Sequence, residues 1–145
     1  MTLALALVGG VGVGCKTADT ADSGDQASVL ISGHSEAEIR QAAAAVFTGQ
    51  QFQAAPSAMR EQVFERKASN SSNFFHNGWL GADEGLWERV KLTFLPKGDN
   101  SFVVGLNAYL VAYRGQGFFE EEKKRSGAYS GSYGKLLQAI EQKLK

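Results

Sequence analysis

Apolar and polar residues alternate most clearly in the middle of the chain, over residues 88–95. Every second position there is large and apolar, which predicts a strand with one buried face: Val90, Leu92 and Phe94. The five residues 96–100, Pro-Lys-Gly-Asp-Asn, have the composition of a turn, and residues 101–114 are strand-like again. The pattern therefore predicts a long antiparallel hairpin.

Shorter strands are expected on the N-terminal side of this hairpin. Residues 27–33 predict a buried strand, with Val29 and Ile31 on one face and Leu30 on the other. Residues 51–54 could add a short strand, and residues 61–68 predict another in which Val63 and Phe64 point inward. These segments would extend the hairpin into a sheet.

Two helices are predicted by apolar residues at helical spacing. Ser35 followed by Glu38 has the spacing of a capping box, so a helix is expected over residues 35–48, ending at Gly49. Its inward side would carry Ile39, Ala42, Ala43, Val46 and Phe47. A second, amphipathic helix is expected over residues 133–145, with Leu136, Leu137, Ile140 and Leu144 on one side.

The order of these elements predicts a single α+β domain over residues 27–145. One strand, one helix, several antiparallel strands and a last helix are best arranged as one sheet. The helices at about 35–48 and about 133–145 would both pack on one face of it. Within residues 113–133, the glycine and aromatic residues on either side of the charged block 120–125 could form a flexible flap.

The first seventeen residues carry a different signal. An uncharged apolar run ends in Gly14 and in Cys15, the only cysteine of the chain. This segment resembles a bacterial lipoprotein signal with an imperfect lipobox, in which Gly12 stands where a branched apolar residue is usual. The resemblance implies that residues 1–14 are a signal peptide and that Cys15 carries the lipid.

Residues 15–26, small and rich in Asp, Thr and Ser, would then form a flexible tether between the lipid and the domain. The resemblance implies a protein of the bacterial cell envelope that is attached to a membrane through its acyl chains. Lys16 stands where an aspartate would favour retention at the inner membrane, so the outer membrane is favoured in a Gram-negative host.

The same residues allow a rival interpretation as a phosphate-binding loop. Residues 10–17, Gly-Val-Gly-Val-Gly-Cys-Lys-Thr, approximate the Gly-x-x-x-x-Gly-Lys-Thr pattern, but Cys15 replaces the glycine before Lys16. The residues that follow have no helical periodicity and carry three aspartates, which would repel phosphate. The lipoprotein interpretation is therefore favoured.

Charge and composition exclude several classes of function. Fifteen basic and fifteen acidic residues cancel, which argues against a nucleic-acid partner. The chain has one cysteine and two histidines without a ligand spacing typical of zinc, so no metal or cofactor is predicted. A lipid-bearing Cys15 would also leave no disulfide, so stability must come from the core.

Aromatic residues gather in one predicted loop, residues 69–82. Phe74, Phe75, His76 and Trp79 could form a binding loop, or they could fold back as a lid on the core. The lid is favoured because long loops in small domains need apolar anchors. We expect Trp79 to be buried and at least one of Phe74 and Phe75 to be accessible.

Two charged segments are candidate functional sites. Asp83, Glu84 and Glu88 are interpreted as exposed acids at the start of a helix, since nothing predicts the burial that acid–base chemistry needs. The block 120–125, Glu-Glu-Glu-Lys-Lys-Arg, is interpreted as a solvated surface. No catalytic residue is predicted.

Two classes of function remain. The favoured one is a non-enzymatic, lipid-anchored envelope domain that binds a protein partner or a small ligand. The alternative is a small envelope hydrolase that pairs His76 with Asp83 or Glu84. The chain lacks a Gly-x-Ser-x-Gly nucleophile motif, which favours binding.

Overall fold

The computed structural model describes residues 25–69, 85–125 and 127–145. Over these ranges the helices and strands follow in this order: β1 (Ala27–Ser32), α1 (Glu36–Gly49), β2 (Gln53–Ala55), β3 (Glu61–Lys67), β4 (Trp87–Pro96), β5 (Ser101–Ala112), the 3-10 turn η1 (Gly117–Phe119), β6 (Glu121–Lys124), the 3-10 turn η2 (Gly127–Tyr129) and α3 (Ser130–Lys143).

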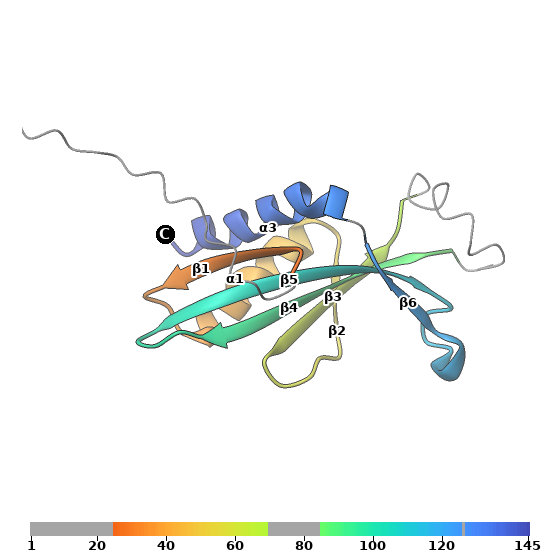
Figure 1. Cartoon of the computed structure of the whole chain (residues 1–145), viewed down its shortest axis with the longest axis horizontal. Coiled ribbons are helices and arrows are strands. Elements are labelled where there is room, and N and C mark those ends of the chain that lie inside the picture. Colours follow the sequence, from red (N-terminus) through yellow and green to blue (C-terminus); the bar gives the residue numbers. More distant parts are fainter. Residues whose placement is uncertain (1–24, 70–84, 126) are drawn as a thin grey trace, which may run out of the picture.

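The strands form one antiparallel sheet in the order β1-β5-β4-β3-β2, and β6 also pairs with β5. Both helices lie on the same face of this sheet (Figure 1). The predicted single-domain α+β fold is therefore confirmed, including the hairpin of β4 and β5. The face opposite the helices is hereafter the open face.

The first helix begins where the capping box predicts. The hydroxyl of Ser35 accepts a hydrogen bond from the backbone N–H of Glu38 at 3.3 Å, and the Glu38 carboxylate accepts one from the backbone N–H of Ser35 at 2.7 Å. The helix runs through Gly49, and the residue that caps it is Gln50 rather than a glycine. The chain then reverses through Gln51, whose φ is 65°.

The main core lies between the helices and the sheet. Alternate residues of β4 and β5, Ile31 of β1, Phe64 of β3 and one side of each helix supply buried apolar side chains to it. Phe47 stands at its centre, stacked on Phe64 with ring centroids 4.5 Å apart and edge-on to Phe52 at 5.2 Å.

One local expectation was wrong. Leu30, in a strand expected to be buried, is 57% exposed because only the helix side of β1 is covered. Residues 121–124, for which no strand was expected, form β6. The reason is that β1 pairs only with residues 101–106 of β5, which leaves the later backbone groups of β5 available to β6.

Candidate functional site

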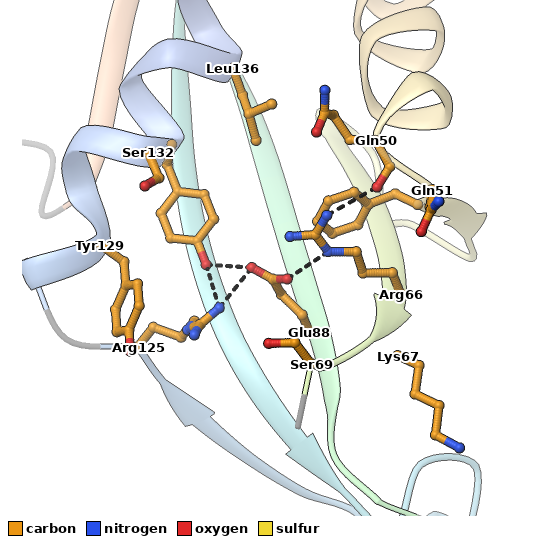
Figure 2. Close-up of a pocket in the computed structure, with 12 residues that line it drawn as sticks. Gln50, Gln51, Arg66, Lys67, Ser69, Glu88, Arg125, Tyr129, Ser132 and Leu136 are labelled. Carbon is orange, nitrogen blue, oxygen red and sulfur yellow. Dashed lines mark hydrogen bonds and ion pairs between the residues drawn. The ribbon is translucent and has the colours of Figure 1, made fainter. Parts of the chain in front are cut away.

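A pocket of about 630 Å³ opens on the helix side of the sheet, where neither helix covers it. It lies between the end of α1 and the start of α3, above the last residues of β3 and the first residues of β4. Figure 2 shows its lining, which is composed of Gln50, Gln51, Phe52, Arg66, Lys67, Ser69, Glu88, Arg125, Tyr129, Ser132, Tyr133 and Leu136.

Glu88 lies at the floor of this pocket and is only 4% exposed. It occupies the second position of β4, on the same face as Val90 and Leu92. Its carboxylate accepts hydrogen bonds from the Tyr133 hydroxyl at 2.6 Å, from Nη1 of Arg125 at 2.8 Å and from Nε of Arg66 at 2.8 Å. Three donors from three parts of the chain therefore meet on one carboxylate.

The two arginines reach Glu88 from opposite sides (Figure 2). Arg66 is the cross-strand neighbour of Glu88 on β3. Its guanidinium lies 4.3 Å from the centroid of the Phe52 ring and donates to the backbone carbonyl of Gln50 at 3.0 Å. These contacts tie the end of α1 to the sheet through Arg66.

Arg125 follows β6 and connects the far side of the pocket. Its guanidinium lies 4.0 Å from the centroid of the Tyr129 ring, and its Nη1 also donates to the Tyr133 hydroxyl at 3.1 Å. The backbone N–H of Arg125 bonds to the carbonyl of Ala108 at 2.8 Å, continuing the ladder of β6. The sheet thus aims this side chain at Glu88.

Electrostatics keep the Glu88 carboxyl group ionised. Burial alone would raise its pKa, but the hydrogen bonds from Tyr133 and Arg66 and the charges of Arg66 and Arg125 outweigh burial and hold the pKa below its usual value. Burial and the hydrogen bond to Glu88 raise the pKa of the Tyr133 hydroxyl, which stays protonated. The cluster is therefore a fixed charge arrangement at neutral pH.

The pocket is positive in balance and partly apolar. Among the described residues that line it, Arg66, Lys67 and Arg125 are cationic and Glu88 alone is anionic. The N-terminal end of α3 borders it as well, and its first turn carries no acidic residue. A helix N-terminus has partial positive charge. Phe52 and Leu136 supply apolar wall, so the pocket suits a small molecule with an anionic group and an apolar part.

A second charged cluster lies on the open face of the sheet. Arg89 donates to Glu65 at 2.6 Å and to Glu120 and Glu122 at 2.7 Å each. Arg114 donates to the second oxygen of the buried Glu65 at 2.6 Å. Although burial alone would lower the pKa of Arg89, the hydrogen bonds to Glu120, Glu122 and Glu65 raise it. These ion pairs connect β3 and β4 to two later segments, the loop after β5 and the strand β6.

Most residues singled out by the sequence lie outside the described part of the chain. This applies to the proposed lipid site, to the aromatic loop and to the alternative catalytic pair: Cys15, Phe74, Phe75, His76, Trp79, Asp83 and Glu84. The predictions of a lipid anchor, of a lid and of a hydrolase pair therefore stay predictions.

Glu88 is the site residue that the sequence interpretation placed wrongly. It was expected to be an exposed acid at a helix start, but it is a buried strand residue. The signal was present, because extending the alternation of Val90, Leu92 and Phe94 by one step backward puts position 88 on the buried face. A carboxylate on that face calls for buried partners.

The charged block 120–125 was expected to be a solvated surface, and this is wrong in part. β6 itself is exposed. Arg125, however, is buried against Glu88, and Glu120 and Glu122 are held by Arg89. The periodicity of a four-residue edge strand is too short to show which of its charges turn inward.

Comparison with known proteins adds no assignment. No protein-family model matches the chain, and no curated protein matches its sequence.

Within residues 25–69, 85–125 and 127–145 there is no cluster of three or more metal-ligating side chains. No helix in the described part of the chain is long and apolar enough to cross a membrane. The proposal for function therefore starts from the pocket itself.

Proposed function

We propose that this chain is a lipid-anchored protein of the bacterial envelope whose domain binds a small amphiphilic anion. The ligand would occupy the pocket between α1 and α3, with its anionic group toward Arg66 and the start of α3. Its apolar part would lie on Phe52 and Leu136. The observation that carries the proposal is the excess of cationic side chains around a preformed pocket with a partly apolar lining.

The size of the pocket supports this class of ligand. Sites for small molecules usually enclose about 300–1,000 Å³ and combine apolar walls with a few fixed polar groups. The volume here is about 630 Å³. Glu88 holds Arg66 and Arg125 in place before any ligand arrives, which lowers the ordering cost of binding.

The state of Glu88 favours binding over acid–base catalysis. A general base needs a pKa near the working pH and an available oxygen. The pKa of Glu88 is lowered, and both of its oxygens already accept hydrogen bonds. Its role in the proposal is to position two arginines.

Two fluorescent probes can test the pocket. Anilinonaphthalene sulfonate is an amphiphilic anion, and N-phenylnaphthylamine is its uncharged counterpart. We expect the purified chain to bind the anion more tightly. Ser132→Glu places a carboxylate in the pocket and should weaken binding of the anion by about tenfold or more through charge repulsion. The variant should keep its fold, because an acid in the first turn of a helix is favourable.

Gln138→Glu is the matched control, since this residue is exposed on the same helix and does not line the pocket. It should bind both probes like the parent chain. The proposal of an anion site is wrong if both probes bind equally, or if Ser132→Glu and Gln138→Glu have the same effect. Fluorescence titration at constant ionic strength measures all of these affinities.

The lipid anchor is tested separately. The apolar segment before Cys15 and the polar tether after it support acylation of this residue. Cys15→Ser should abolish incorporation of labelled fatty acid and release the protein from the membrane fraction of the host. Membrane association that survives the substitution, together with a mature protein that still begins at Met1, would contradict the anchor.

A further inference from the structure

Two phenylalanines project from the turn between β5 and β6. Phe118 is 97% exposed and Phe119 is 69% exposed, and their ring centroids lie 5.8 Å apart. Both belong to η1, which lies at the far end of the hairpin from the helices (Figure 1). Residues 114–119 are all exposed, so within the described part of the chain the two rings stand on an exposed turn.

The turn is ordered by its own hydrogen bonds. The backbone N–H of Gly115 donates to the Glu120 carboxylate at 2.8 Å, and the N–H of Phe119 and that of Glu120 close the 3-10 turn. Gly115 and Gly117 have φ values of 80° and 59°, which favour glycine and turn the chain back sharply. Because Arg89 also holds Glu120, the two rings are presented by a turn fastened to the sheet.

Two of the three acidic residues after Phe119, Glu120 and Glu122, are paired with cations on the sheet. The carboxylates of Glu120 and Glu122 form ion pairs with Arg89 on the open face. The carboxylate of Glu122 also forms an ion pair with Lys91. The hydrogen bonds from Arg89 and Gly115 lower the pKa of Glu120. Two of the three neighbouring carboxylates are thus neutralised by partners on the sheet.

We propose that this turn inserts Phe118 and Phe119 into the interfacial layer of a phospholipid bilayer. A stable protein interface buries about 800 Å² on each partner, far more than two side chains on a narrow turn can offer. Aromatic residues on a polar turn are sufficient for the headgroup boundary of a bilayer, where binding scales with the apolar area buried. The binding partner that suits two aromatic side chains on a narrow turn is therefore a lipid surface.

The length of the chain between Cys15 and the domain is compatible with insertion of the turn into the same membrane. This argument rests on the proposed lipid anchor at Cys15. Asp25 is held at the open face by the side chain of Asn107 on β5 at 2.5 Å. Ten residue steps separate Cys15 from Asp25 and span at most about 35 Å. β5 runs from Asn107 to Ala112 toward the turn, a distance of roughly 17 Å. One membrane could therefore hold both the lipid and the two rings.

Vesicle binding tests the insertion without the lipid anchor. The protein would be the chain from residue 15 with Cys15→Ser, and the vesicles would consist of phosphatidylethanolamine and phosphatidylcholine. We expect measurable partition of this protein, and a decrease of about tenfold or more in the partition coefficient of the double variant Phe118→Ala, Phe119→Ala. Met59→Ala is the control, because Met59 is 91% exposed in the loop between β2 and β3.

A reporter variant, Phe118→Trp, adds a second measurement. Its additional fluorescence should shift to the blue with vesicles and should be quenched by brominated lipid. Sedimentation equilibrium of the parent and the double variant checks for self-association. The proposal is overturned if the parent does not partition, if the double variant partitions like Met59→Ala, or if the double substitution instead dissolves a dimer.

Failure of this inference and failure of the proposed function give different results. The vesicle assay uses unacylated protein, so absence of lipid on Cys15 in the host leaves its result unchanged. Probe binding to the pocket also does not depend on the turn. Loss of vesicle binding with intact lipid labelling and probe binding would contradict only the insertion of Phe118 and Phe119.

Discussion

Glu88→Ala is expected to lower the free energy of unfolding by about 3–5 kcal/mol, the range for removing one partner of a buried ion pair. The carboxylate holds Arg125, whose side chain is buried, and the substitution would remove this ion pair. It would also remove the acceptor of the Tyr133 hydroxyl. Urea denaturation followed by circular dichroism measures the change.

Two controls separate burial from charge. Glu141→Ala removes the exposed partner of Lys145 and should cost no more than about 1 kcal/mol. Glu88→Gln keeps an acceptor oxygen but not the charge, so its cost should fall between those of the two alanine variants. If Glu88→Ala costs no more than Glu141→Ala, the buried cluster does not hold the fold together.

The free energy of unfolding of the same variants, measured as the pH is lowered, checks the direction of the contribution from the Glu88 charge. The pKa of Glu88 in the folded chain lies below its usual value of 4.5. The stabilisation from its ion pairs is therefore complete above that pH and is lost as the pH falls through the folded pKa. Glu88→Gln should consequently lose less stability on acidification than the parent chain does.

Phe47→Ala is the second large effect that we expect, with a loss of about 3–5 kcal/mol. Phe47 has no exposed surface and contacts the rings of Phe64 and Phe52. Truncation removes both ring contacts and leaves a cavity where α1 meets the sheet. Thermal and urea unfolding of the variant and the parent give the difference.

Phe118→Ala is the matched control for this truncation, because the same side chain is removed from a fully exposed position. Its effect on stability should lie within about 0.5 kcal/mol. Equal losses for Phe47→Ala and Phe118→Ala would contradict either the described core or the exposure of the turn. The comparison therefore tests both the packing of Phe47 in α1 and the exposure of Phe118 in η1.

Local signals were sufficient to predict both helices and the β4–β5 hairpin. The capping box at Ser35 and the apolar spacing after it placed α1, and the alternation around Val90 together with the turn at Gly98 placed the β4–β5 hairpin. These features act between near neighbours in the chain, so they can be recognised without knowing the tertiary structure. They also determined which side of each helix faces the sheet.

The pocket could not be predicted in the same way, because its parts are distant in sequence. Arg66, Glu88 and Tyr133 come from two strands and a helix. Although Glu88 was expected to be exposed, the alternation in β4 carries the signal for its burial; the residues that neutralise it depend on strand register and on the position of α3.

The sequence by itself determined the α+β class, the capped helix, the hairpin and the inward faces of the two helices, because each follows from periodicity and turn chemistry within a short segment. Only the tertiary structure decided that Arg125 turns inward while Phe118 stays outside. That outcome depends on β6 pairing with the part of β5 that β1 leaves open. Such pairing is a long-range choice of backbone partners, and the four-residue segment that makes it carries no periodicity of its own.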